Sequence, residues 1–287
     1  MTPKARIECC RVSLEIKNET LRRHLHSLGR VLIAYSGGVD SAYLAYAAHQ
    51  ALGENMLALI ADSPSLARTQ LADALLFAQE QHIPCQVIQT QELENPDYAR
   101  NDAQRCFHCK DELFTIMERY RGEHGFDAIA YGVNLDDQGD FRPGQQAAQQ
   151  HRVVAPLLEG KLTKADVREL ARLAGLRVWE KPASACLASR IEYGRAVTAE
   201  ALSAVEQGEE ALRRLGFRQY RVRHHGAIVR IEIAREELPR ALSPAMAAAF
   251  TGIFKQLGFN YVTLDLEGFR SGSMNAVLPA ELIAKAR

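Results

Sequence analysis

Three cysteines lie in settings where a thiol can do chemistry. Cys106 and Cys109 form a C-x-x-C pair at the start of a predicted helix, and Cys186 follows much later within a run of small residues. Thiolates at this spacing can share one metal ion or cluster, and the neighbouring Arg105 and Lys110, with the helix N-terminus, are expected to lower their pKa values. The pair alone leaves zinc, iron–sulfur, redox and incidental roles open.

A third thiolate would favour an iron–sulfur cluster over zinc. A structural zinc site takes four ligands, and the sequence has no second C-x-x-C and no histidine pair at finger spacing. A [4Fe–4S] cluster held by three thiolates would leave one iron open to an exogenous ligand. Cys106, Cys109 and Cys186 are therefore our candidate catalytic and cluster-binding residues, and three unconnected buried thiols are the alternative.

A glycine-rich hexapeptide, Ser36-Gly37-Gly38-Val39-Asp40-Ser41, joins a predicted buried strand to a predicted helix. We call these residues the phosphate loop. Its glycines let the backbone turn sharply near a ligand, and the helix N-terminus offers unpaired N–H groups and a favourable dipole. The hexapeptide matches neither G-x-x-x-x-G-K-[ST] nor G-x-G-x-x-G. It predicts a phosphate or pyrophosphate site, and a turn without a ligand is the alternative.

Strand-like and helix-like segments alternate before and after this loop. Apolar runs predict strands, and helical spacing predicts the segments between them. In chain order, helices and strands are expected alternately at 14–28, 31–34, 41–52, 56–61, 65–82, 85–89, 110–121 and 127–131. This alternation predicts a doubly wound α/β fold with a parallel sheet.

Polar residues follow the fourth predicted strand. Asn134, Asp136 and Asp137 lie at its carboxyl end, where open α/β sheets bind ligands, although Asx turns in a polar loop are an equally good interpretation. Residues 134–152 contain Gly and Pro, and we expect them to form a loop over the sheet.

The pattern changes near residue 190. Helices at 198–215 and about 244–257 alternate with strands at 220–223, 227–233 and 261–266. We therefore predict two domains, residues 1–190 and a smaller α+β domain at 191–287. Strand alternation would place Arg221 and Arg223 on one face, suited to hold a phosphate, and a solvated strand face is the alternative.

Composition narrows the setting. The 287 residues include 35 basic and 35 acidic side chains, and the pI is near 7.1. A field that neutral gives no global attraction to nucleic acid or an anionic membrane. No apolar run approaches the ~20 residues that cross a bilayer, and the N-terminus lacks the apolar core of a secretory signal. We expect a cytoplasmic protein that binds neither nucleic acid nor membrane.

Four longer motifs follow the phosphate loop in order: NPDYARNDAQRCFHCKDELF, YGVNLDDQGDFRPG, EKPASACLASRIEYG and GFRSGSMN. With SGGVDS they resemble the LarE family, ATP-dependent sulfur transferases of nickel-pincer cofactor assembly in the PP-loop ATP pyrophosphatase superfamily. The resemblance runs from about residue 30 to residue 275 and makes residues 1–190 the PP-loop domain. It implies Mg²⁺ beside the pyrophosphate, and ATP contacts from Ser36, Gly37, Gly38, Asp40, Ser41, Gly132 and Asn134. It also implies a phosphate-binding patch for the substrate at Arg221, Arg223, Glu210 and Glu232.

The resemblance implies a two-step reaction. ATP adenylates a carboxylate of pyridinium-3,5-biscarboxylic acid mononucleotide, and sulfur then displaces AMP to give a thiocarboxylate. In one branch the cysteine matching Cys186 gives up its sulfur and the protein retains dehydroalanine. In another, three cysteines hold a [4Fe–4S] cluster that carries sulfide, and Cys106 and Cys109 fit this branch. A homo-oligomer, a trimer or hexamer, is also implied, with the C-terminal domain serving substrate binding and oligomerisation.

Three other classes remain. Thiolation of tRNA also uses PP-loop chemistry with C-x-x-C cysteines, but the neutral pI and the lack of a recognisable RNA-binding appendage argue against it. An amide-forming ligase resembling NAD or GMP synthetases would need ammonia and no cysteines. A non-catalytic nucleotide-binding module is the third.

Overall fold

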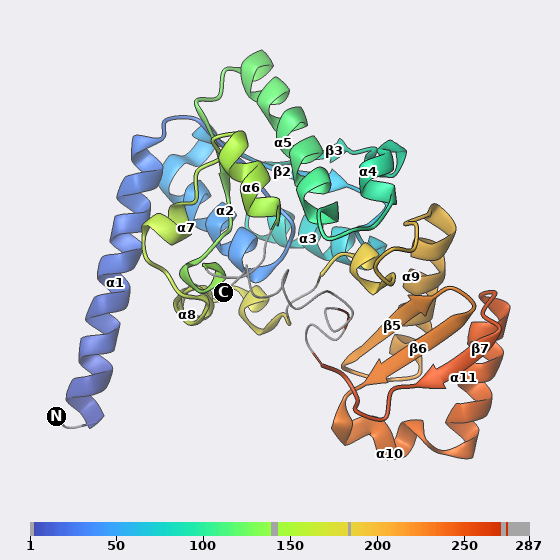
Figure 1. Cartoon of the computed structure of the whole chain (residues 1–287). Helices are drawn as coiled ribbons and strands as arrows, with labels where there is room; N and C mark the ends of the chain where they lie inside the picture. The colour runs from blue at the N-terminus through green and yellow to red at the C-terminus, as the bar shows by residue number, and fades with distance from the viewer. Residues whose placement is uncertain (1–2, 139–142, 183–184, 271–273, 275–287) are drawn as a thin grey trace.

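The computed structural model of the chain describes residues 3–138, 143–182, 185–270 and 274. Within these residues two β-sheets form, each with helices packed against it (Figure 1). The elements before residue 190 are α1 (Pro3–Ser27), β1 (Val31–Ala34), α2 (Val39–Leu52), η1 (Gly53–Asn55), β2 (Met56–Asp62), α3 (Arg68–Glu80), β3 (Cys85–Gln89), η2 (Glu92–Glu94), α4 (Pro96–Ala99), α5 (Arg105–His124), β4 (Ala128–Tyr131), η3 (Leu135–Asp137), α6 (Pro143–Gln150), α7 (Pro156–Glu159), α8 (Lys164–Leu173), η4 (Arg177–Glu180) and η5 (Leu187–Arg190). Those that follow are α9 (Ala199–Arg214), β5 (Tyr220–His225), β6 (Ile228–Ile233), η6 (Arg235–Glu237), α10 (Leu238–Ala241), α11 (Pro244–Gln256) and β7 (Tyr261–Leu264).

The first sheet is parallel throughout, with the strand order β3-β2-β1-β4. All four residues of β1 are buried, which explains why this strand is a continuous apolar run rather than an alternating one. One face packs against α1, α2, α3 and α8, and the other packs against α5 and α6. The predicted doubly wound α/β fold is confirmed.

The strand order also locates a ligand site. After β1 the chain builds outward through β2 and β3, and it then crosses to the other side of β1 to form β4. In open α/β sheets, ligands bind outside the carboxyl ends of the strands at the point where the order reverses. Here that point lies between the ends of β1 and β4, so it is formed by the phosphate loop and the residues after Tyr131.

The second sheet, with the order β5-β6-β7, belongs to the predicted smaller α+β region. β5 and β6 pair antiparallel, and β6 and β7 pair parallel. Helices α9 and α11 cover this sheet, and Figure 1 shows the assembly as a separate C-terminal lobe (α9 to β7). The boundary at residues 190 and 191 stays a prediction, because Tyr98 and Leu187 pack in the same apolar cluster as this lobe.

Two predictions about local structure need correction. Residues 134–152 are not a continuous loop, because they include η3 and helix α6. The proline we took as a breaker is the first residue of α6, where proline is favoured, and Ala147 and Ala148 bury themselves in the cluster under α5. Helix α1 also starts earlier than predicted, at Pro3. No helix of the described residues is long and apolar enough to span a membrane.

His151 fastens the end of α6 to α5. Its Nε2 lies 2.9 Å from Asp111 and its Nδ1 lies 3.0 Å from Glu118, with the side chain only 13% exposed. Burial alone would lower the pKa of His151, but the hydrogen bonds to the two carboxylates outweigh it and raise the pKa above its usual value. The protonated imidazole is therefore favoured by folding.

This bridge should make part of the stability depend on pH. Because the folded pKa of His151 is the higher one, its stabilisation is fully present below the unfolded value of about 6.5 and is lost as pH rises through the folded pKa. We expect His151→Gln to lower the free energy of unfolding by about 1 kcal/mol more at pH 5.5 than at pH 9, a small value because both carboxylates are substantially exposed. Urea unfolding at both pH values measures it, with the exposed His26→Gln as control. An equal loss at both pH values would contradict the prediction.

Candidate functional site

The phosphate loop is held in a fixed shape by its own serines. The hydroxyls of Ser36 and Ser41 lie 3.0 Å apart, and the Ser41 hydroxyl donates to the Gly38 carbonyl at 3.1 Å. Gly37 has a φ of +70°, and a Cβ there would lie 2.5 Å from the Cβ of Ala74. Gly38 caps α2, so the unpaired N–H groups of the first helical turn open beside the loop.

Gly132 brings the end of β4 against this loop. A Cβ at Gly132 would lie 2.7 Å from the backbone nitrogen of Ser41 and 2.9 Å from the carbonyl carbon of Asp40. Glycine is therefore required by close approach of two backbones. The structure thus brings together the predicted ATP contacts at the switch point of the sheet.

Asp40 is the charged centre of that contact. Asn134 donates to it at 3.0 Å through Nδ2, and the ammonium of Lys164 lies 3.7 Å away. Burial raises the pKa of Asp40, while Lys164 and Asn134 oppose the rise. Asp137, also buried, accepts from the backbone N–H of Asn134 at 3.1 Å. Carboxylate oxygens of this kind suit Mg²⁺, so the donor set fits the implied ion.

Lys164 was missed by the sequence analysis. It is the first residue of α8, where Thr163 and Asp166 form a capping box. The sequence does contain a signal for this position. The pattern T-x-x-D at residues 163–166 marks a helix N-terminus, and Lys164 falls in the first turn of that helix.

The three candidate cysteines share one region of the molecule. Cys106 and Cys109 lie in the first turns of α5, Cys186 precedes η5, and each thiol interacts electrostatically with the other two. Cys106 and Cys186 keep solvent-exposed surface and Cys109 is half-buried, but protein surrounds the thiol groups of Cys106 and Cys109 closely enough to desolvate them. Within the described part of the chain no three His, Cys, Asp or Glu side chains form a ready-made metal site. Three thiols with a shared field nevertheless have the donor chemistry that an iron–sulfur cluster needs.

The predicted lowering of the thiol pKa values is wrong for Cys106 and Cys109. Desolvation by the surrounding protein raises the pKa of Cys109 to about 12, and it also raises that of Cys106, although Arg105 and Lys110 act in the opposite direction. Burial therefore outweighs the nearby cations. A metal or cluster would reverse this order, because it binds the deprotonated thiolate.

Hydrogen bonds from several elements fix the Cys186 segment, residues 185–190. Arg190, which is 2% exposed, donates through Nη1 to the Cys186 carbonyl at 2.8 Å and through Nε to Glu209 at 3.0 Å. The N–H of Leu187 donates to the carbonyl of Ser65 at 2.8 Å. The backbone of Cys186 is thus tied both to the loop after β2 and to helix α9.

A buried polar group beside the thiols also escaped the sequence analysis. The Tyr98 hydroxyl is hydrogen-bonded to Ser65, and the Ser63 hydroxyl donates to Glu92. All four side chains are buried, and Tyr98 interacts electrostatically with Cys186 and Cys109. Ser63 follows β2 directly, so the carboxyl-end rule applied to Asn134 would have found it.

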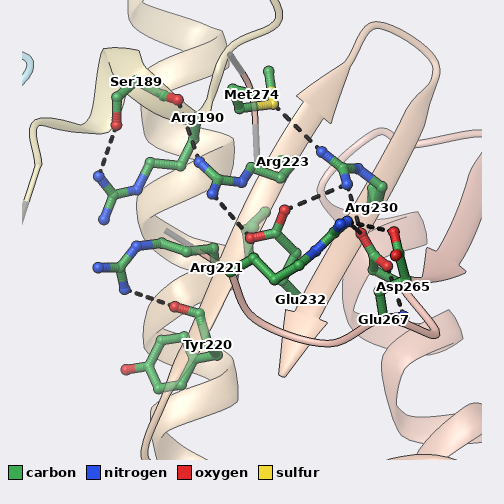
Figure 2. A network of polar contacts seen from close by, with 12 residues as sticks. Ser189, Arg190, Tyr220, Arg221, Arg223, Arg230, Glu232, Asp265, Glu267 and Met274 are labelled. Atoms are coloured by element: carbon green, nitrogen blue, oxygen red, sulfur yellow. Dashed lines mark hydrogen bonds and ion pairs between the residues drawn. The ribbon is translucent and has the colours of Figure 1, made fainter. Parts of the chain in front are cut away.

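The arginine patch consists of Arg190, Arg221 and Arg223. Arg223 donates to Glu232 at 2.9 Å and to the Ser189 carbonyl at 3.4 Å, as Figure 2 shows. The pKa of Arg221 is lowered first by burial and then by the charge of Arg190. Crowded, desolvated guanidinium groups favour an anion such as phosphate.

Glu210 lies apart from this patch. It pairs with Arg213 and Arg214 along α9, and the preceding residue, Glu209, makes the contact with Arg190. The structure therefore brings Arg221, Arg223 and Glu232 together, whereas Glu210 forms ion pairs with arginines of its own helix. Residues 271–273 of the motif GFRSGSMN lie outside the described residues.

Comparisons with known proteins identify a family and several relatives of the chain. A family model described as NAD synthase matches residues 14–113. The pyridinium-3,5-bisthiocarboxylic acid mononucleotide synthase of Lactiplantibacillus plantarum is 34% identical over 95% of this chain and 98% of its own length. An uncharacterised Synechocystis protein is 43% identical over 92% of this chain and 99% of its own length. The tRNA-5-methyluridine(54) 2-sulfurtransferase of Pyrococcus horikoshii is 31% identical over 39% of this chain and 37% of its own length.

The contact at Gly132 gives a test of the site. We expect Gly132→Ala to force the phosphate loop out of place, to weaken ATP binding at least tenfold, and to cost about 1–3 kcal/mol of folding stability from overpacking. Calorimetric ATP titration and urea unfolding measure the two effects. Gly122→Ala is the matched control, because that glycine lies in α5 with nothing within 4 Å of the added Cβ. Unchanged ATP affinity in Gly132→Ala would refute the close contact.

Proposed function

The chain belongs to the LarE family of PP-loop sulfur transferases, and from that membership we propose that it converts a carboxylate of pyridinium-3,5-biscarboxylic acid mononucleotide into a thiocarboxylate at the expense of ATP. It is an ATP-dependent sulfurtransferase that releases pyrophosphate and AMP. The observation that carries the proposal is the position of the Cys186 segment. That segment is hydrogen-bonded to Ser65, in the loop that follows β2 of the first sheet, and to Arg223 of the arginine patch.

The first step is adenylation at the phosphate loop. A substrate carboxylate oxygen attacks the α-phosphorus of ATP, the bond to the bridging oxygen breaks, and pyrophosphate leaves. The first-turn N–H groups of α2 and the hydroxyls of Ser36 and Ser41 bind the leaving pyrophosphate. Asp40 would hold Mg²⁺, which would offset the charge of the leaving pyrophosphate, and Lys164 places a further cation beside Asp40.

The second step is sulfur transfer. The sulfur of hydrosulfide attacks the acyl carbon, the carbon–oxygen bond to AMP breaks, AMP leaves, and the proton passes to solvent. Cys106, Cys109 and Cys186 would hold a [4Fe–4S] cluster. When bound, such a cluster supplies an iron with an open position for sulfide. Sacrificial donation from Cys186, leaving dehydroalanine, is the alternative within the same family.

The arginine patch binds the phosphate of the mononucleotide. Arg221 and Arg223 provide the donors, Glu232 orients Arg223, and Arg190 links the patch to Cys186. Glu210, which pairs with Arg213 and Arg214 on α9, stays a proposed residue of the substrate site on the family resemblance alone. We also propose a cytoplasmic homo-oligomer, a trimer or hexamer, that binds neither nucleic acid nor membrane. The short match to the tRNA sulfurtransferase supports shared nucleotide chemistry rather than an RNA substrate.

Asp40 provides a test of the first step. Asp40→Asn should lower the rate of pyrophosphate release with the dicarboxylate mononucleotide by about 100-fold, because the ion that offsets the leaving charge loses its ligand. A coupled phosphate assay after pyrophosphatase measures it. Glu123→Gln, an exposed change in α5, should leave the rate unchanged. Equal rates in Asp40→Asn and wild type would remove Asp40 from the site.

Iron analysis provides a test of the second step. Wild-type protein purified without oxygen should contain about four irons and four acid-labile sulfides per chain, and Cys186→Ala should lose them. Cys85→Ala is the matched control, because Cys85 lies in β3 and should retain the iron. A wild-type chain that stays iron-free after anaerobic reconstitution would exclude the cluster. Cys186 would then be the donor, and mass spectrometry after one turnover would detect dehydroalanine.

A further inference from the structure

We propose, on the basis of the proposed function, that Arg105 makes the cysteine site an anion site. Its guanidinium is the counter-charge for negative charge at this site, both that of the Cys106 and Cys186 thiolates once they are deprotonated and that of the small sulfur anion, hydrosulfide, that enters the site. It is also the positioning residue that sets Cys186 against helix α5. Nothing in the reaction scheme above uses this side chain.

Arg105 carries a buried charge that has no acidic partner among the described residues. Arg105 is 4% exposed, and no carboxylate of the described residues forms an ion pair with it. The nearby acids have other partners, because Asp102 pairs with Arg100 and Glu192 pairs with Arg195. A desolvated cation is costly unless an anion lies close to it.

The ionisable side chains that act most strongly on the Arg105 guanidinium are cysteines and tyrosines. Burial lowers the pKa of this guanidinium, but the charges of Cys186 and Cys106, followed by those of Tyr193 and Tyr98, outweigh burial and raise the pKa above its usual value. The Tyr193 ring lies under the guanidinium, with the ring centre 5.6 Å from Cζ. An aromatic face stabilises a cation without neutralising it. The groups left to neutralise Arg105 are therefore these two cysteines, when deprotonated, and an anion bound beside them.

The hydrogen bonds of Arg105 connect two parts of the cysteine site. Nη1 of Arg105 donates to the side-chain oxygen of Asn101 and to the carbonyl of Ala188 at 2.9 Å. Asn101 is fully buried and donates in turn to the Glu192 carbonyl at 2.9 Å. One guanidinium thus joins the helix that carries Cys106 to the segment that carries Cys186.

The charge can be measured with two alkylating reagents. The full chain, reduced and freed of iron by a chelator, is treated with iodoacetate, which is anionic, or with iodoacetamide, which is neutral. Mass spectrometry gives the rate at each cysteine. The same thiolate attacks the carbon of either reagent and displaces iodide, so the ratio of the two rates reports the local potential and does not depend on how much thiolate is present.

We expect this ratio at Cys106 and Cys186 to exceed that of 2-mercaptoethanol. In Arg105→Gln it should fall about tenfold, the effect of one unit charge a few ångströms away in partly solvated surroundings. Arg105→Lys should keep most of the ratio, and so should Arg100→Gln, a change at an exposed residue between α4 and α5. An unchanged ratio in Arg105→Gln would overturn the proposal.

Two features keep the experiment decisive. If Arg105→Gln does not fold, the wild-type ratio alone still decides, because a value no higher than that of 2-mercaptoethanol would overturn the proposal. The assay uses no ATP, substrate or cluster, so an iron-free or inactive wild type would count against the proposed function and leave this result readable. The positioning role predicts, in addition, that Arg105→Lys lowers the iron content while keeping the alkylation ratio. Full iron loading in Arg105→Lys would remove that role.

Discussion

The contact between Gly132 and the phosphate loop is the constraint on which the site depends. Two backbones meet there with no room for a side-chain carbon, so the end of β4 and the start of α2 have one relative position. That position places Asn134 on Asp40 and brings α8, with Lys164, to the same edge. The parallel sheet brings the carboxyl ends of its strands to one edge. Gly132 lets the end of β4 approach the phosphate loop at that edge.

A second set of contacts transmits that order to the thiols. The Cys186 segment contains only the short 3-10 helix η5, and hydrogen bonds of its backbone with arginines and with Ser65 hold it in place. These arginines are almost fully buried, so each carbonyl they bind lies where water cannot compete well for it. The site therefore gains its geometry from side chains that reach backbone atoms rather than from a rigid strand or helix beneath the cysteine.

Most of the fold followed from local pattern, and most of the site did not. The apolar run of β1 and the alternation of Arg221 and Arg223 have a short period that is visible in sequence. The contact of Arg105 with Ala188 joins residues far apart in the chain, so no local pattern announces it. The direction of the pKa shift of the Cys106 and Cys109 thiols was predicted wrongly. Neighbouring charges can be read from the sequence, whereas burial depends on the packed structure. Helix α6 was missed because Pro143 begins it.

The cysteines come from two different parts of the architecture. Cys106 and Cys109 belong to a helix over the first sheet, and Cys186 leads into η5, whose Leu187 packs in the core of the C-terminal lobe. A group bound by all three thiols would therefore link helix α5 to the segment that packs against the C-terminal lobe. By mass action, whatever binds only the folded arrangement stabilises it. The melting temperature would then depend on whether the sample had been exposed to oxygen. A melting curve would show which fraction of the chains holds the bound group.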